Sequence, residues 1–344
     1  MYLQSLATAF PERSFTQEEC LHILEGSGAL EAVRPRSRDI LRKVLKGDSG
    51  IVTRNLSSEK LENVFRSDAG ALHRLFEKEA PRLASEALLR ACLEASVRAS
   101  EIDALLVCTC TGYLCPGLSS YISERLGMRP NAFLQDLLGL GCGAAIPMLE
   151  AARGITATSP GAVVATVAVE ISSAAFYLDD DPGVLISLCL FGDGAAAALW
   201  RSENRGAQLR FSNFRTLHKP EHREKIRFVN ANGRLKNQLH RSVPELAAEA
   251  VGELYAMRSA DPERIIAHTG GRDVIEAIER RIPAFRLDET RTVLSSHGNI
   301  SSPSVLVALK EALSNPRSPG NHFWLTSFGA GFAAHSCELR RDRE

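Results

Sequence analysis

The chain alternates between segments with helical apolar spacing and short apolar runs of strand length. Apolar residues spaced three and four apart predict helices over 17–25, 36–46, 81–99, 119–126, 142–153, 244–257, 272–281 and 304–313. Apolar runs predict strands over 103–110, 132–136, 161–170, 195–200, 264–268, 290–295 and 322–327. Buried strands separated by helices indicate an α/β protein with a mostly parallel sheet.

The second half of the chain repeats the rhythm of the first. Composition becomes more polar between residues 206 and 236, after which strand, glycine turn and helix follow one another again. We therefore predict two similar halves, residues 1–205 and 206–344, within the 344 residues.

Composition narrows the classes of function. The 41 basic and 41 acidic residues cancel, so no charge pattern for nucleic acid or an anionic membrane is visible. No apolar run reaches the roughly 18 residues of a membrane span, and the N-terminus lacks the pattern of a signal peptide. Eight cysteines without such a signal favour free thiols in a reducing compartment, so we expect a cytoplasmic protein.

Cys142 is the first candidate for chemistry. It stands between Gly141 and Gly143, after a predicted strand and at the start of an apolar helix. The positive end of the helix dipole lowers the pKa of a thiol at that position, and glycines allow a substrate to approach closely. The alternative is an inert buried cysteine, which is what most free cysteines are.

A histidine and an asparagine also follow predicted strands. His268 ends "RIIAH" before a glycine turn, and Asn299 follows the predicted strand 290–295 and precedes a helix. Taken singly, each is more commonly a core, cap or turn residue, and His297 competes with His268 as the catalytic histidine. Together with Cys142 they form a plausible nucleophilic site, because the carboxyl ends of parallel strands meet at one crevice. The local signature of a papain-like protease is absent.

Seven motifs, in order, resemble the type III polyketide synthases, the chalcone synthase-like branch of the thiolase superfamily, and they favour a bacterial member. The motifs are "LATAFPERSFTQEE", "LLVCTCTGYLCPG", "GCGAAIPMLEAARG", "LCLFGDGAAAALW", "HTGG", "HGNISSPSV" and "SFGAGFAAH". The resemblance implies a thiolase-like five-layer αβαβα fold of two duplicated halves with mixed, mostly parallel sheets. It also implies a homodimer with residues 113–119 at the interface.

The resemblance assigns roles residue by residue. Cys142 would be the acyl-accepting nucleophile, and His268 and Asn299 its partners. The substrate cavity would be lined or supported by Phe191, Cys110, Thr111, Cys115, Glu170, Ser172, Ser187 and Ser301. Arg42, Lys43 and Lys46 would face the CoA phosphates, the alternative being a solvated helix face.

Three positions depart from the family pattern. A second cavity phenylalanine would fall near Asn237, so this part of the cavity is either polar or misaligned. Thr269 and Ala330 replace prolines of the histidine turn and the C-terminal glycine loop. These changes leave the expected chemistry intact and leave the starter and product open.

The implied activity is that of an acyltransferase that makes polyketides. An acyl-CoA starter would be loaded on Cys142, extended by decarboxylative condensation with malonyl-CoA, and cyclised to a pyrone, resorcinol or phloroglucinol type of product. CoA thioesters would be substrates, with no separate cofactor. A metal site is not expected at Cys108, Cys110 and Cys115, because no second ligand pair accompanies them. The alternatives are a single-condensation enzyme like ketoacyl-carrier-protein synthase III and a catalytically silent partner subunit.

Overall fold

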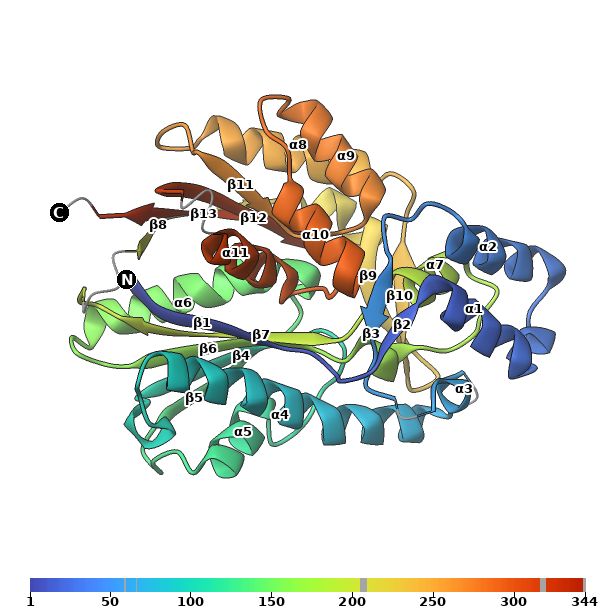
Figure 1. The fold of residues 1–344 in the computed structure, drawn as a ribbon, viewed down its shortest axis with the longest axis horizontal. Coiled ribbons are helices and arrows are strands. Elements are labelled where there is room, and N and C mark those ends of the chain that lie inside the picture. Colours follow the sequence, from blue (N-terminus) through green and yellow to red (C-terminus); the bar gives the residue numbers. More distant parts are fainter. Residues whose placement is uncertain (59, 66, 205–208, 316–319, 343–344) are drawn as a thin grey trace.

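One large sheet, in two parts, forms the framework of the molecule (Figure 1). The computed structural model describes residues 1–344 except 59, 66, 205–208, 316–319 and 343–344. The N-terminal part contains β1 (Tyr2–Ala9), β4 (Ala104–Cys108), β5 (Phe133–Leu137), β6 (Val164–Glu170) and β7 (Gly194–Arg201). The C-terminal part contains β8 (Leu209–His218), β11 (Arg264–Ala267), β12 (His322–Gly329) and β13 (Ala333–Arg341). The order is β11-β12-β13-β8-β1-β7-β6-β4-β5, and the two parts join where Tyr2 pairs with Arg210.

Helices complete five layers around these two parts. The central layer holds α6 (Ala145–Thr158) and α11 (Ser304–Ser314), between the two parts of the sheet (Figure 1). One outer layer holds α4 (Ala69–Glu94) and α5 (Leu118–Leu126), and the other holds α8 (Val243–Ala256) and α9 (Arg272–Arg281). Separate apolar clusters fill the central layer and each outer layer. The predicted thiolase-like αβαβα architecture is therefore confirmed.

The sheet is mixed, as predicted, but it is not mostly parallel. Among the described strands, β4 pairs in parallel with β5 and β6, and β11 with β12. The other pairings, β1–β7, β1–β8, β6–β7, β8–β13 and β12–β13, are antiparallel. Antiparallel neighbours need no crossover helix, so the count of helices between strands overestimated the parallel share.

Most predicted helices and strands lie within a few residues of their observed bounds. The largest difference in a helix is α4, which begins twelve residues before the predicted start at Pro81, because Asp68 caps it by accepting a hydrogen bond from the Ala71 N–H. The polar stretch after residue 206 contains β8 and a hairpin, β9 (Ile226–Ala231) and β10 (Arg234–Leu239), which the apolar pattern missed. The predicted boundary between residues 205 and 206 lies outside the described residues.

The strand predicted over 290–295 is wrong, because this segment lies in helix α10 (Asp288–His297). Its β-branched residues suggested a strand, yet Thr290, Val293 and Leu294 are buried at helical spacing. The helix covers the free edge of β11: the Thr290 hydroxyl accepts from the Ala267 N–H at 3.2 Å and donates to the Ala267 carbonyl at 3.1 Å. Both backbone groups of the residue before His268 are satisfied in this way.

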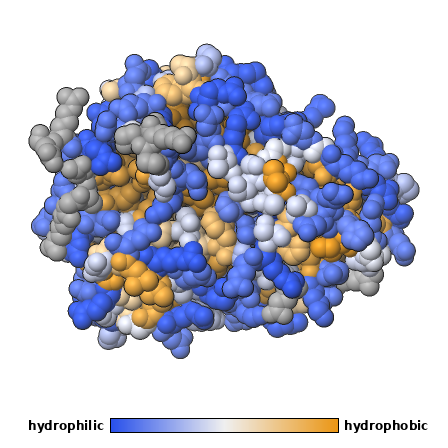
Figure 2. All heavy atoms as spheres, in the orientation of Figure 1, coloured by the Kyte–Doolittle hydropathy of each residue, from blue (hydrophilic) through white to orange (hydrophobic). Residues whose placement is uncertain are grey.

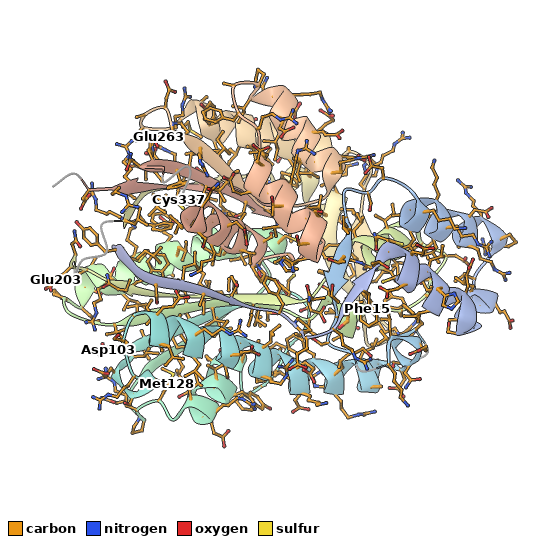
Figure 3. The ribbon with its side chains drawn as sticks, in the orientation of Figure 1. Phe15, Asp103, Met128, Glu203, Glu263 and Cys337 are labelled. Carbon is orange, nitrogen blue, oxygen red and sulfur yellow. The ribbon has the colours of Figure 1, made fainter. Side chains whose placement is uncertain are left out.

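A cap of smaller elements closes the end of the molecule to which the carboxyl ends of β4 and β6 point. β4 begins beside Asp103, at the left of Figure 3, and runs toward this cap. The cap contains α1 (Gln17–Gly26), α2 (Pro35–Lys46), α3 (Leu61–Val64), α7 (Pro182–Leu190), β2 (Ser14–Thr16), β3 (Thr53–Asn55), β9 and β10. Short 3-10 turns lie at Ala29–Ala32, Ala99–Glu101, Gly141–Gly143, Ser172–Ala175 and Pro220–Lys225. In the described parts of the chain, no helix is both long and apolar enough to span a bilayer.

Candidate active site

Cys142 lies in a tight turn directly before the buried helix α6. The turn, Gly141–Gly143, is a 3-10 segment, and Gly141 has a φ of 59°, which glycine adopts without strain. Cys142 itself is only 8% exposed. Because the sulfur sits at the N-terminal end of α6, the helix dipole favours its thiolate form.

The surroundings of Cys142 lower its pKa well below the usual range of a thiol. The largest cause is a hydrogen bond with Cys110, followed by the opposing effect of burial, a hydrogen bond with His268 and the His268 charge. Ser301 Oγ donates a further hydrogen bond to Cys142 Sγ at 3.1 Å. The pKa of Cys110 is raised well above its usual range, first by its hydrogen bond with Cys142 and then by burial. Of the two thiols, Cys142 is therefore the one whose thiolate form the site favours.

His268 follows β11 and is 1% exposed. Its ring packs edge-on against Phe328, with 5.1 Å between the centroids, and its Nδ1 lies 2.6 Å from Ser304 Oγ. Because Nδ1 faces Ser304, the nitrogen that interacts with Cys142 is Nε2. The structure thus brings the predicted histidine to the predicted cysteine.

Asn299 lies on the other side of Ser301. Its Oδ1 accepts from the Ser301 N–H at 2.9 Å and from the Thr269 hydroxyl at 3.3 Å, and its Nδ2 donates to the Gly270 carbonyl at 3.1 Å. Ser301 has a φ of 54°, an uncommon conformation for a serine, and the Asn299 amide holds it there. Asn299 is therefore coupled to Cys142 through the Ser301 hydroxyl.

His297 lies elsewhere. Its ring stacks on Phe10 at 3.8 Å between centroids, and its Nδ1 lies 2.8 Å from Asn55 Oδ1. Burial lowers its pKa to about 4. The geometry therefore favours His268 over His297 as the partner of Cys142.

Glu170 supports the site from behind. It is fully buried at the end of β6, and burial raises its pKa. Its carboxyl group accepts hydrogen bonds from the segment after β4 and from the loop after Asn299. The donors are the Thr109, Thr111 and Ser302 hydroxyls and the Cys110 and Thr111 N–H groups. Cys110 Sγ and Ser301 Oγ, which donate to Cys142, each lie 3.3 Å from Glu170 Oε1. This network fixes Cys110 and Ser301 against Cys142.

A partly open chamber adjoins the site, with about 420 Å³ of space not filled by protein, some of it open to solvent. Seven of the predicted cavity residues line it: Cys110, Thr111, Ser172, Ser187, Phe191, Asn237 and Ser301. Glu170 lies behind Cys110 and Ser301. Cys115 is exposed and lines neither this chamber nor the larger cavity beside it, so the single chain does not bring Cys115 to the site. A second, slightly more open cavity spans about 1440 Å³, including space open to solvent, and shares Cys110, Thr111, Phe228 and Leu235 with the chamber.

Phe228 is a lining residue that the sequence analysis missed. Asn237 does line the chamber, where its Nδ2 donates to Ser187 Oγ at 2.7 Å. Phe228 pairs with Asn237 across the β9–β10 hairpin and lines both cavities. An aromatic side chain is thus supplied by the neighbouring strand. Predicting the β9–β10 hairpin from the sequence would have placed Phe228 opposite Asn237 and so identified Phe228 as a lining residue.

Arg42, Lys43 and Lys46 lie on α2, which packs against α7 in the apolar cluster that also includes Cys142. All three side chains are exposed, and Arg42 Nε is 2.9 Å from Glu25 Oε1. None of the three lines either cavity.

The described residues contain no cluster of three or more His, Cys, Asp or Glu side chains that could hold a metal ion.

Gly329 sets how closely β12 approaches the cysteine turn, which provides a test of the site. A Cβ at Gly329 would lie 2.6 Å from the Gly143 nitrogen and 2.6 Å from the Leu140 carbonyl oxygen. We expect Gly329→Ala to displace the turn, destabilise the protein by about 1–3 kcal/mol and lower reactivity of Cys142 toward iodoacetamide. Gly154→Ala is the matched control, because a Cβ there meets nothing within 4 Å. Equal alkylation rates at Cys142 in the two variants would contradict the assigned close contact.

Comparison with family models identifies two matching regions. Residues 7–251 match the model described as FAE1/Type III polyketide synthase-like protein, and residues 254–341 match the model described as 3-oxoacyl-[acyl-carrier-protein] synthase III C terminal.

Similar curated proteins and solved structures agree with these models. The chain is 27% identical to phloroglucinol synthase from Pseudomonas fluorescens, over 94% of this chain and 95% of that protein. It is 29% identical to 3,5-dihydroxyphenylacetyl-CoA synthase from Streptomyces toyocaensis, over 95% and 86%. The C-terminal type III polyketide synthase domain of Steely1 from Dictyostelium has the same fold, with a TM-score of 0.90 over 99% of both chains at 19% identity. The 1,3,6,8-tetrahydroxynaphthalene synthase from Streptomyces coelicolor superposes with a TM-score of 0.87 over all of both chains at 24% identity.

Proposed function

Because the chain belongs to the FAE1/type III polyketide synthase-like family, we propose that it condenses an acyl-CoA starter with malonyl-CoA and cyclises the resulting polyketide. The observation that carries this proposal is the buried Cys142, with a lowered pKa, beside His268 and Asn299. A thiolate is the form of cysteine that attacks a thioester, and the surroundings of Cys142 favour that form.

Loading begins with the Cys142 thiolate attacking the thioester carbonyl of the starter. A new S–C bond forms, the bond from carbonyl carbon to CoA sulfur breaks, and CoA leaves as a thiolate that takes up a proton. Ser301 and Cys110 donate hydrogen bonds to Cys142 before the attack. The acyl group then occupies the adjoining chamber, whose lining includes Phe191 and Ser172.

Extension needs a site that stabilises an oxyanion. Malonyl-CoA loses carbon dioxide, and the electron pair of the broken C–C bond remains as an enolate whose charge lies on the thioester oxygen. His268 Nε2–H and the second N–H of the Asn299 amide are the donors we assign to that oxygen. The enolate carbon then bonds to the acyl carbonyl carbon, and Cys142 leaves as a thiolate, ready for the next round.

The expected product is a hydroxylated aromatic ring or a pyrone. Two-carbon extension places oxygen on every second carbon, so ring closure gives a 1,3 pattern of hydroxyl groups. The names of the relatives, phloroglucinol synthase, 3,5-dihydroxyphenylacetyl-CoA synthase and 1,3,6,8-tetrahydroxynaphthalene synthase, describe products of this kind. CoA thioesters are the only substrates this chemistry requires, and it needs no further cofactor.

We also assign a place for the CoA phosphates and for a second subunit. The exposed cations of α2, Arg42, Lys43 and Lys46, would bind the phosphates.

A homodimer would form along β5, the edge strand of the sheet, near the exposed side chains of Phe133 and Tyr113. Figure 2 shows an apolar patch in the region of α4, α5 and β5, one of several on this face. The free state of all eight cysteines agrees with a cytoplasmic location.

The test of the proposed function is product analysis. We would incubate the purified protein with malonyl-CoA and a panel of acyl-CoA starters, and read both products and intact protein by mass spectrometry. We expect an acyl adduct on the protein, and products that carry two or more added acetate units. Absence of any acyl adduct and any product across the panel would contradict the proposal.

A single-condensation enzyme is the second candidate, because residues 254–341 match the synthase III C-terminal model. It would give products extended by one acetate unit, or act only with a malonyl carrier protein. The same mass spectra distinguish this outcome from iterative synthesis.

A further inference from the structure

Ser304, the first residue of α11, is outside the set of residues to which the function assigns a role. It is fully buried, and its Oγ lies 2.6 Å from His268 Nδ1. The same Oγ lies 2.6 Å from the Ser301 carbonyl oxygen. One hydroxyl group thus stands between the proposed catalytic histidine and a backbone carbonyl.

The proton count at this hydroxyl decides the direction of both hydrogen bonds. A serine has one O–H donor, and the Ser301 carbonyl can only accept. If Ser304 donated to His268 Nδ1, two oxygen atoms would face each other at 2.6 Å without a proton between them. With the reverse arrangement, the Ser304 hydroxyl donates to the Ser301 carbonyl and accepts from His268 Nδ1–H, so every group is satisfied.

We propose that Ser304 is a positioning residue that fixes the tautomer of His268, with the proton on Nδ1 and the lone pair of Nε2 toward Cys142. The inference rests on the proposed role of His268 as the partner of Cys142. The Cys142 S–H bond breaks, its proton forms an N–H bond at Nε2, and its electron pair remains on sulfur. The opposite tautomer would place an N–H at Nε2, which cannot take that proton.

Ser304 also stabilises the charged form of His268. When Nε2 takes the proton, Nδ1–H still donates to Ser304 Oγ, and the Ser304 O–H still donates a hydrogen bond to the Ser301 carbonyl. The imidazolium then has a partner for each N–H in a site that excludes water, which a buried cation requires. The other ring contact from a packed element is Phe328 of β12, which is apolar.

The titratable groups that face Cys142 come from three different elements. They are Cys110 after β4, Glu170 at the end of β6 and His268 after β11. His335 of β13 lies near Gly143, but burial lowers its pKa to about 4, so it is neutral above that pH. Among these groups Ser304 hydrogen-bonds to His268, and its other side-chain partner, the Ser301 carbonyl, does not titrate. A change in the charge near the thiolate on removing Ser304 therefore acts through His268.

The direct test is nitrogen-15 NMR of the histidine side chains in the Cys142→Ala protein, recorded at a pH where the His268 ring carries a single proton. The His268→Gln spectrum identifies the His268 signals among the nine histidines. We expect a protonated Nδ1 and an unprotonated Nε2. In the Cys142→Ala, Ser304→Ala double variant, we expect this preference to be lost. Protonated Nε2 with Ser304 present, or no change on removing its hydroxyl, overturns the proposal.

The reactivity test uses Ser304→Ala with Cys142 intact. Loss of the acceptor for Nδ1–H should raise the midpoint of the pH profile for Cys142 alkylation by about one unit. Thr166→Val is the matched control: it removes a fully buried hydroxyl that accepts from Trp200 Nε1 at 2.8 Å, in the central core. An unshifted midpoint in Ser304→Ala, or an equal shift in Thr166→Val, overturns the proposal. If the tautomer is found but no polyketide forms, the proposed function fails and this assignment stands.

Discussion

Replacing Cys142 by alanine is expected to abolish both acyl loading and product formation. The thiolate supplies the covalent bond that holds the starter and every later intermediate, and no neighbouring group can replace it. Cys110 is close, but burial and the Glu170 charge raise its pKa even without Cys142, and this disfavours its thiolate. We expect a loss of about 10⁴-fold or more in product formation, as for other removed nucleophiles. Intact-protein mass spectrometry with the acyl-CoA panel reads the loading step directly.

Cys92→Ala is the matched control for Cys142→Ala. Cys92 is a buried cysteine of α4 in an outer layer, and burial raises its pKa to about 11. This variant removes a thiol of similar burial without touching the site, so loading and product should match the unchanged protein. Acyl adducts that persist in Cys142→Ala would assign the nucleophile to another residue, and peptide mapping would show which one.

The sequence pointed to candidate residues that the structure brings together, because Cys142 and His268 each leave a local mark, although neither mark was decisive alone. Flanking glycines mark the turn at Cys142, where β12 comes close enough to exclude a Cβ at Gly329. His268 follows an apolar run before two glycines. Such marks reflect local backbone geometry, and they can be recognised from residues that are adjacent in the sequence.

The features that the sequence did not predict depend on contacts between distant segments. The pairing of Cys110 with Cys142 joins the ends of β4 and a turn before α6. The role of Phe228 depends on its register with Asn237 across a polar hairpin. Residues 290–295 have strand-like composition, but a helix there lets Thr290 satisfy both backbone groups of Ala267. Tertiary contacts override local propensity in that segment.

His268→Gln is expected to slow product formation by about 10²–10⁴-fold and to raise the pKa of Cys142. Both the hydrogen bond and the charge of His268 lower the Cys142 pKa in the folded protein. Glutamine keeps a hydrogen-bond donor but has no positive charge, so the thiolate forms at higher pH. The midpoint of Cys142 alkylation with iodoacetamide should therefore rise by about 1–3 units. Peptide mass spectrometry separates Cys142 from the exposed Cys115 in this measurement.

Asn299→Ala separates the two roles that we assign to His268. Asn299 forms hydrogen bonds with Ser301, Thr269 and Gly270. Ser301 stands between Asn299 and the sulfur of Cys142, so Asn299 does not bond to the thiol itself. We expect the alkylation midpoint to move far less than in His268→Gln, whereas condensation should fall by about 10²–10³-fold, because one donor to the enolate oxygen is lost. Starter loading should then proceed while extension fails, so the acyl adduct accumulates on Cys142. Equal loss of loading and extension in both variants would show that Asn299 supports the thiolate, and the oxyanion role would have to be assigned to other donors.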